Sequence, residues 1–105
     1  MVALFYAETT FSKYKSGIYS CPVNFETALG RINHAVLIVG QDDSGNYIIK
    51  NSWGTTWGNQ GYAIINSAAD CGLSAYIYSI DLLQLYQANT IVKLLGLTLL
   101  VLSFS

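Results

Sequence analysis

Charged side chains are scarce in this chain. Asp, Glu, Lys and Arg make up 10% of its 105 residues, whereas a typical soluble domain contains about 25%. The five basic residues are offset by six acidic ones, for a formal net charge of −1, so no electrostatic basis for nucleic-acid binding exists. Hydrophobic residues make up 52% of the chain, which excludes an intrinsically disordered protein. One small domain at most is expected.

Proline and long helical patterns are also rare, and the sequence predicts a series of short strands. The single proline is Pro22. Met1–Ala7 is an apolar run without the basic n-region or the cleavage site of a signal peptide, so a strand is expected there. Short helical turns are expected within Thr9–Lys15 and Phe25–Leu29. Further β-prone segments are residues 18–19, 34–41, 47–51, 62–65 and 75–80.

Two of these strands are predicted to form a β-hairpin. His34–Gln41 and Tyr47–Asn51 flank the turn-forming residues Asp42–Asn46. Folding the chain about this turn places His34, the only histidine, within a residue or two of the cross-strand position opposite Asn51. The two side chains are therefore expected to be close enough to interact.

The segment that follows, Asn51–Tyr62, is dense in tryptophan and glycine, as expected for a compact loop with positive φ angles and large buried rings. Here the sequence, NSWGTTWGNQGY, resembles the papain-like cysteine peptidases of the cathepsin type. The resemblance covers about residues 2–80, because three other segments match the family in the same order. These segments are Ser16–Tyr19, Asn33–Gly40 and Cys71–Leu73.

The resemblance implies a catalytic role for His34 and Asn51. In such enzymes a cysteine thiolate paired with an imidazolium attacks the peptide carbonyl, and the histidine then protonates the leaving amine. His34 matches the general acid and base, Asn51 matches the residue that orients its ring, and Trp53 matches the side chain that shields their hydrogen bond. From the residues alone, a structural histidine and a turn asparagine are the alternatives. Trp57 is expected to pack in the core.

The resemblance also implies that the two cysteines, Cys21 and Cys71, form a disulfide. The alternative, that one of them is the nucleophile, conflicts with the family pattern, because neither stands in a Cys-Gly-Ser/Ala-Cys-Trp/Tyr sequence. The nucleophilic cysteine is therefore absent from the chain, and we expect the chain alone to be inactive. The resemblance implies a lysosomal, vacuolar or secreted location, and the even number of cysteines also favours a secretory or lysosomal compartment.

Substrate contacts are implied for three further residues. By resemblance, Ala35 and Tyr76 would line the second substrate subsite, and the backbone carbonyl of Asn33 would accept a hydrogen bond from the substrate amide. From the residues alone, Tyr76 is equally a strand residue packed in the fold. No metal or cofactor is expected, because Asp42–Asn46 lacks the spacing and the closing glutamate of a calcium loop.

The implied family fold is α+β, and this chain would supply mainly its antiparallel, β-barrel-like right domain over residues 1–80, without the left domain. Residues 81–105 are an apolar tail outside the family pattern, expected to be helical. As a helix, Ile91–Ser105 would be about 22 Å long, shorter than the roughly 30 Å hydrocarbon core of a bilayer. An interfacial or partial membrane helix, a poor GPI-type signal and translated intron sequence are the alternatives for this tail.

The sequence supports two functions of different classes. The first is a cysteine-type endopeptidase of the papain family, present as a C-terminal fragment or truncated gene model and acting on protein or peptide substrates when a left domain completes it. The alternative is a catalytically inactive short homologue that acts as a protein-binding module through its apolar face. A small membrane-tethered β domain is a third interpretation.

Overall fold

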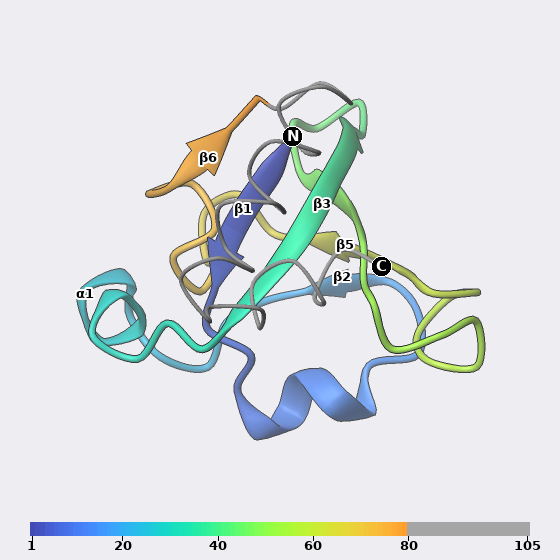
Figure 1. The fold of residues 1–105 in the computed structure, drawn as a ribbon, viewed down its shortest axis with the longest axis horizontal. Coiled ribbons are helices and arrows are strands. Elements are labelled where there is room, and N and C mark those ends of the chain that lie inside the picture. Colours follow the sequence, from blue (N-terminus) through green and yellow to red (C-terminus); the bar gives the residue numbers. More distant parts are fainter. Residues whose placement is uncertain (80–105) are drawn as a thin grey trace, which may run out of the picture.

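The structure, a computed structural model, describes residues 1–79, and its main feature is one six-stranded sheet (Figure 1). The strands are β1 (Val2–Phe5), β2 (Ile18–Tyr19), β3 (His34–Gln41), β4 (Tyr47–Lys50), β5 (Tyr62–Ile65) and β6 (Ile77–Tyr78). A 3-10 helix, η1 (Thr9–Lys13), and an α-helix, α1 (Phe25–Leu29), complete the described chain. The expected strands and helical turns are confirmed, although β6 is shorter than expected. The expected helix in residues 81–105 lies outside the described residues.

The sheet is open and mixed. Its strand order is β2-β5-β4-β3-β1-β6, and within the described residues β2 and β6 form its two edges. Closure into a barrel-like arrangement is therefore not confirmed. The expected antiparallel arrangement does not extend to one pair, because β2 runs parallel to β5. A tight turn forces its two strands to be antiparallel, but β3 and β4 separate β2 from β5 in sequence, so no turn fixes their direction.

The predicted hairpin is present as β3 and β4, with a register that a bulge shifts. Leu37 pairs with Lys50 and Gly40 with Ile48, and the irregularity falls between Ile38 and Gly40. On its other side β3 pairs with β1, where His34 lies opposite Phe5. Asn51 follows the last residue of β4, so it is not a ladder partner of His34 but lies just beyond the end of the neighbouring strand.

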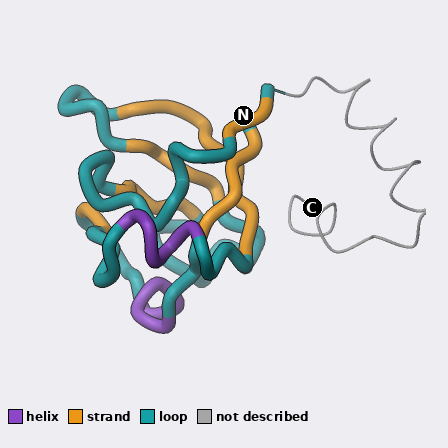
Figure 2. The backbone as a smooth tube through the Cα atoms, turned by 90° about the vertical axis from the view of Figure 1, so that its left-hand side faces the viewer, coloured by secondary structure: helices purple, strands orange, loops and turns teal. Residues whose placement is uncertain are grey.

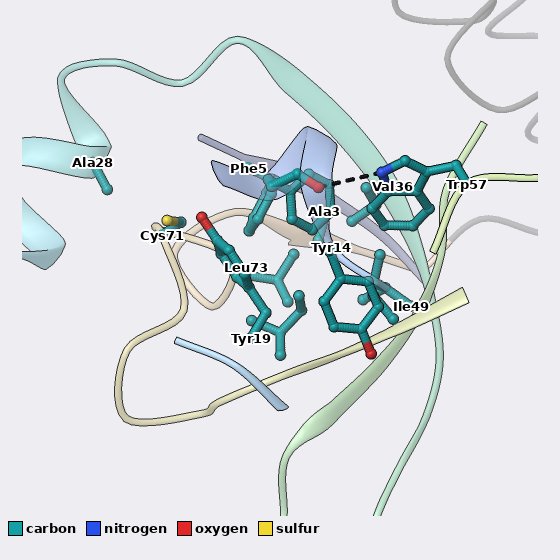
Figure 3. Close-up of a cluster of buried hydrophobic side chains, with 13 residues drawn as sticks. Ala3, Phe5, Tyr14, Tyr19, Ala28, Val36, Ile49, Trp57, Cys71 and Leu73 are labelled. Atoms are coloured by element: carbon teal, nitrogen blue, oxygen red, sulfur yellow. Dashed lines mark hydrogen bonds between the residues drawn. The ribbon is translucent and has the colours of Figure 1, made fainter. Parts of the chain in front are cut away.

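One face of the sheet carries the hydrophobic core (Figure 3). The largest side chains that are completely buried are Phe5, Phe11, Ile49, Ile65, Leu73, Val36 and Cys71. Trp57 is 9% exposed, and its indole N–H donates a hydrogen bond of 3.2 Å to the backbone carbonyl of Phe11, drawn as a dashed line in Figure 3. Trp57 is therefore a core residue, as predicted.

Both short helices lie near the end of the sheet where β1 ends and β3 begins (Figures 1 and 2). The carboxylate of Glu8 caps η1 by accepting a hydrogen bond of 2.8 Å from the backbone N–H of Thr10, one of the donors that a helix start leaves unpaired. This helix carries Phe11 into the core. Among the described residues, no helix has the length and apolar character needed to cross a bilayer.

The predicted disulfide between Cys21 and Cys71 is present, with a Cα–Cα distance of 5.2 Å. It joins the segment between β2 and α1 to the turn that follows β5. Neighbouring backbone hydrogen bonds reinforce this junction, from Cys21 N–H to the Ala69 carbonyl and from Tyr6 N–H to the Cys71 carbonyl, each 2.9 Å long. Since the chain has two cysteines, neither is left as a free thiol.

Candidate active site

The structure brings His34 and Asn51 into direct contact. His34 is the first residue of β3, and Asn51 immediately follows β4. The Nε2 atom of His34 lies 2.7 Å from the Oδ1 atom of Asn51, within hydrogen-bond distance. Asn51 is 6% exposed, so this hydrogen bond is formed away from bulk water, where it is stronger than at an exposed position.

The surroundings of Asn51 determine which ring nitrogen of His34 carries the proton. The same Oδ1 atom accepts a second hydrogen bond, of 2.8 Å, from the backbone N–H of Ser52. Because a backbone N–H can only donate, this atom is the amide oxygen, which can only accept. The Nε2 atom of His34 is therefore the donor, and the neutral ring leaves Nδ1 with the lone pair that can take up a proton.

Trp53 covers the histidine. The His34 and Trp53 rings have centroids 5.0 Å apart and planes inclined by 31°, so the two rings pack in a tilted arrangement. Trp53 is 41% exposed, so one side of its indole meets solvent while the other contacts the imidazole. This placement allows Trp53 to shield His34 from solvent.

Burial has the largest effect on the pKa of His34. Removal of water from around the ring lowers the pKa of His34 below its ordinary value, and the hydrogen bond to Asn51 opposes this effect by raising the pKa. Because the net direction is downward, the ring is neutral near pH 7. The half-buried histidine is thus held as a base, with the proton on the nitrogen that faces Asn51.

Glycines shape the loop that carries Asn51 and Trp53. The backbone N–H of Asn51 donates to the carbonyl of Gly61 over 3.0 Å, which closes the loop at its base. Gly58 has a φ of +60°, and a Cβ atom at this position would lie 2.8 Å from the carbonyl oxygen of Tyr62. Only glycine fits there, so the glycines of this motif support the position of Trp53 and Asn51.

The structure places the three residues that are expected to contact substrate close to β1 or to the segment that follows it. Ala35 is buried and pairs with Leu4 of β1, and the backbone N–H of Leu4 donates to the carbonyl of Tyr76 over 3.1 Å. Ala35 and the exposed Tyr76 thus flank the same residue of β1. The Asn33 side chain binds the backbone of Ala7 through bonds of 2.8 and 3.3 Å. The substrate contacts remain predictions.

Two features of the site were not anticipated from the sequence. One is the Nδ2 atom of Asn51, which is buried and has no hydrogen-bond partner. The other is Phe11, whose ring packs against Trp53, a contact for which residue spacing gives no signal. Within residues 1–79, no three His, Cys, Asp or Glu side chains form a group that could hold a metal ion.

Comparison with known proteins identifies the family. The family described as papain family cysteine protease matches residues 1–80. Mouse pro-cathepsin H is 44% identical over 69 residues, covering 62% of this chain and 20% of its own length. Mouse cathepsin K is 41% identical over 70 residues, with the same two coverages of 62% and 20%. The chain thus spans about a fifth of the length of these curated relatives.

Solved structures agree with this result. The bromelain protease of Ananas comosus, solved in complex with the E64 inhibitor, is 34% identical with a TM-score of 0.54, over 69% of this chain and 35% of its own. Procathepsin L 3 from the larval midgut of Tenebrio molitor is 30% identical with a TM-score of 0.58, over 70% of this chain and 25% of its own. The chain belongs to the papain family of cysteine proteases.

Proposed function

We propose that this chain supplies the histidine–asparagine half of a cysteine endopeptidase site. The observation that carries this proposal is the 2.7 Å hydrogen bond between His34 and Asn51, beneath the indole of Trp53. The bond leaves Nδ1 of His34 as the nitrogen that can exchange a proton with a reacting group. A neutral, half-buried imidazole oriented by a second side chain is the arrangement that a general base requires.

The chemistry follows from this arrangement. Nδ1 of His34 takes the proton of a cysteine thiol, and the resulting thiolate raises the pKa of the imidazolium that it faces. The thiolate attacks the substrate carbonyl, and the proton on Nδ1 passes to the leaving amine, which leaves an acyl-enzyme for water to hydrolyse. Throughout, Asn51 keeps Nε2–H in place, and Trp53 limits the access of water to their bond.

The thiolate must come from outside these 105 residues. Both cysteines of the chain, Cys21 and Cys71, are consumed by the disulfide, and neither can be a nucleophile while they are bonded. We therefore infer that the chain alone does not hydrolyse peptides and that a segment carrying the nucleophile, the left domain of the family fold, must complete the site.

A chimaera tests this proposal. Residues 1–79 would replace the matching segment of mouse cathepsin K, and cleavage of a dipeptidyl fluorogenic substrate would be measured. We expect an active chimaera that loses roughly 10³-fold or more of its activity in His34→Ala, whereas the exposed-residue control Lys13→Ala keeps it. A folded chimaera without activity would overturn the proposal. Cleavage by the purified 105-residue chain, abolished by His34→Ala, would overturn the inferred inactivity.

The substrate contacts form part of the same proposal. Ala35 and Tyr76 are proposed to line the second subsite, with the Asn33 carbonyl accepting the substrate amide; their positions on either side of Leu4 in β1 support this. In the chimaera, Tyr76→Ala should change the preference among bulky apolar residues at the second substrate position. A preference profile identical to that of the unmutated chimaera would argue against a pocket at Tyr76.

The apolar outer face of the sheet supports a second candidate, a protein-binding module. Register places Ile18, Ile64 and Ile48 in one row across β2, β5 and β4, on the face opposite the buried cluster. Lys50 is the one charged residue among the described strands. If the chain is such a module, it should bind the nucleophile-bearing half of mouse cathepsin K in calorimetry, and Ile64→Lys should weaken binding. Absence of binding would eliminate this candidate.

An oxidising compartment, lysosomal, vacuolar or secreted, is proposed for the protein. The Cys21–Cys71 disulfide supports this placement, because such bonds persist in oxidising environments and are rare in the cytosol. Alkylation of free thiols at the moment of cell lysis, followed by mass spectrometry, should find both cysteines unmodified. Full alkylation of both would contradict the placement.

A further inference from the structure

Cys71 has a backbone conformation that its residue type rarely adopts. Its φ is +54°, and among residues 1–79 the only other residue besides glycine with a positive φ is Gln60. The next residue, Gly72, has a φ of +83°, so two consecutive residues are left-handed. A side chain with a Cβ atom makes this conformation unfavourable, and it persists only where the surrounding contacts enforce it.

The contacts that enforce this conformation are of two kinds. Both carboxylate oxygens of the buried Asp70 accept hydrogen bonds, of 3.0 and 3.1 Å, from backbone N–H groups later in the same turn. Two other contacts join Cys71 to distant parts of the chain, the disulfide to Cys21 and the 2.9 Å hydrogen bond from the Tyr6 N–H to the Cys71 carbonyl. The turn can move as a unit only if these two contacts are broken.

The segment that follows Cys71 is held to the sheet by few contacts. It ends in β6, an edge strand that pairs with β1 at two positions (Figure 1). The Leu4 N–H adds a hydrogen bond of 3.1 Å to the Tyr76 carbonyl. Residues 76–78 are exposed, whereas Leu73 is completely buried. The attachment of this segment to β1 therefore depends on its anchors at Cys71 and Leu73.

The two sulfur atoms of the disulfide differ in their access to solvent. Cys21 is half-buried, whereas Cys71 is 1% exposed, so a reagent from solvent reaches Cys21 first. A pocket of about 240 Å³ lies between the residues that follow Cys21 and the turn formed by Ser67–Cys71. This volume is open space beside the turn, into which the backbone of Cys71 can move once its bond to Cys21 is broken.

We propose that the Cys21–Cys71 disulfide is a redox-sensitive switch. In the oxidised chain it holds Cys71 in the left-handed conformation, and reduction by a small-molecule thiol releases residues 71–78 from β1. Tyr76 lies in the released segment, so reduction also removes this residue from the second substrate subsite. That last consequence rests on the proposed function, whereas the release itself is a property of this chain and needs neither nucleophile nor substrate.

Reduction takes two steps. The thiolate of the small molecule attacks the sulfur of Cys21, the disulfide bond breaks, and Cys71 leaves as a thiolate that takes a proton from water. A second thiolate attacks the small-molecule sulfur of the mixed disulfide, which frees Cys21 and forms the oxidised small molecule. Two thiols thus supply the two electrons that reduce the disulfide. Cys71 can then return to a negative φ, and its carbonyl turns away from Tyr6.

The first test is hydrogen exchange followed by NMR on the full 105-residue chain, oxidised or reduced with dithiothreitol. Reduction should accelerate exchange at the Tyr6 and Leu4 N–H groups by about 5- to 30-fold more than at the Asn51 N–H. The Asn51 N–H is the matched reference because it donates to the Gly61 carbonyl, outside the released segment. Equal acceleration at all three groups, global unfolding included, or unchanged exchange at Tyr6 would overturn the proposal.

A matched pair of variants isolates the left-handed conformation from the loss of the covalent bond. Both carry Cys21→Ala, and they differ in Cys71→Ala or Cys71→Gly. Glycine adopts a positive φ without a steric penalty, so the glycine variant should keep the Tyr6 N–H protected about fivefold better than the alanine variant. Equal protection in the two variants would show that the disulfide does not act through the conformation of Cys71 and would overturn the proposal.

The second test traps the intermediate. The oxidised chain is treated with reduced glutathione, alkylated with iodoacetamide and examined by mass spectrometry. We expect the mixed disulfide on Cys21 and the alkyl group on Cys71. Glutathione on Cys71, or a disulfide that glutathione does not open, contradicts the switch. None of these measurements depends on peptidase activity, so failure of the switch is distinguishable from failure of the proposed function.

Discussion

Reduction of the Cys21–Cys71 disulfide should remove a large part of the stability of this chain. The bond closes a loop with a sequence separation of 50 residues. In the chain-entropy treatment, a loop of this length lowers the entropy of the unfolded chain by about 14 cal/mol/K, which corresponds to about 4 kcal/mol at 25 °C. A domain of this size has a total unfolding free energy of roughly 5–15 kcal/mol. Reduction is therefore expected to remove between about a quarter and four fifths of the unfolding free energy.

The assay is urea unfolding of the full chain, with the disulfide oxidised or reduced. Unfolding is followed by the combined fluorescence of the two tryptophans, Trp53 and Trp57. With a denaturant slope of roughly 1.5 kcal/mol/M, loss of the bond should lower the urea concentration at the transition midpoint by about 2.7 M. A Cys21→Ala, Cys71→Ala double variant controls for effects of the reductant and should behave as the reduced chain does. A loss below about 1 kcal/mol, with the bond verified by mass spectrometry in the oxidised sample, would refute the entropic reasoning.

Other predictions concern the histidine, its loop and the cap of η1. Asn51→Ala removes the hydrogen bond that raises the pKa of His34, so NMR titration should find that pKa lowered further; a rise would contradict the assignment. Because the folded pKa of His34 lies below its unfolded value of 6.5, stability should fall as pH drops below about 6.5, and His34→Gln should flatten this dependence in urea titrations. Gly58→Ala should destabilise by about 2–3 kcal/mol, more than the matched Gly54→Ala, because both have positive φ but only Gly58 meets backbone. The pKa of Glu8 is about 2 owing to hydrogen bonds from Thr10, so its capping contribution should persist as pH falls below 4.5 and be lost toward pH 2; carboxyl NMR with Glu8→Gln as control checks this, and titration near 4.5 would contradict it.

The local elements and the central pair of the site could be predicted from the sequence because both depend on short-range patterns. The β-branched run from His34, the turn residues after it and the next apolar run define a hairpin, and a hairpin brings its two ends together. The contact between His34 and Asn51 is therefore a consequence of chain geometry. The exact pairing could not be predicted, because the bulge next to Gly40 changes the register by one residue.

The arrangement of distant elements could not be derived in this way. The parallel pairing of Ile18 with Ile64 joins two short segments separated by a whole hairpin, and no local pattern specifies its direction. The contacts of Phe11 with Phe5 and Trp57 are of the same kind, because they depend on packing between a helical turn, a strand and a loop. The edges of the sheet also depend on such long-range pairings.

The position of β1 in the sheet bears on how this protein is synthesised. Residues 2–5 pair with residues 34–37 on one side and with residues 77–78 on the other. A nascent chain emerging from the ribosome can therefore complete one edge of β1 and assemble the contacts of His34 while the other edge stays unpaired until Ile77 has been made. Since translation proceeds at about 5–20 residues per second, that edge is exposed for seconds, an interval in which a chaperone or a neighbouring nascent chain could bind it.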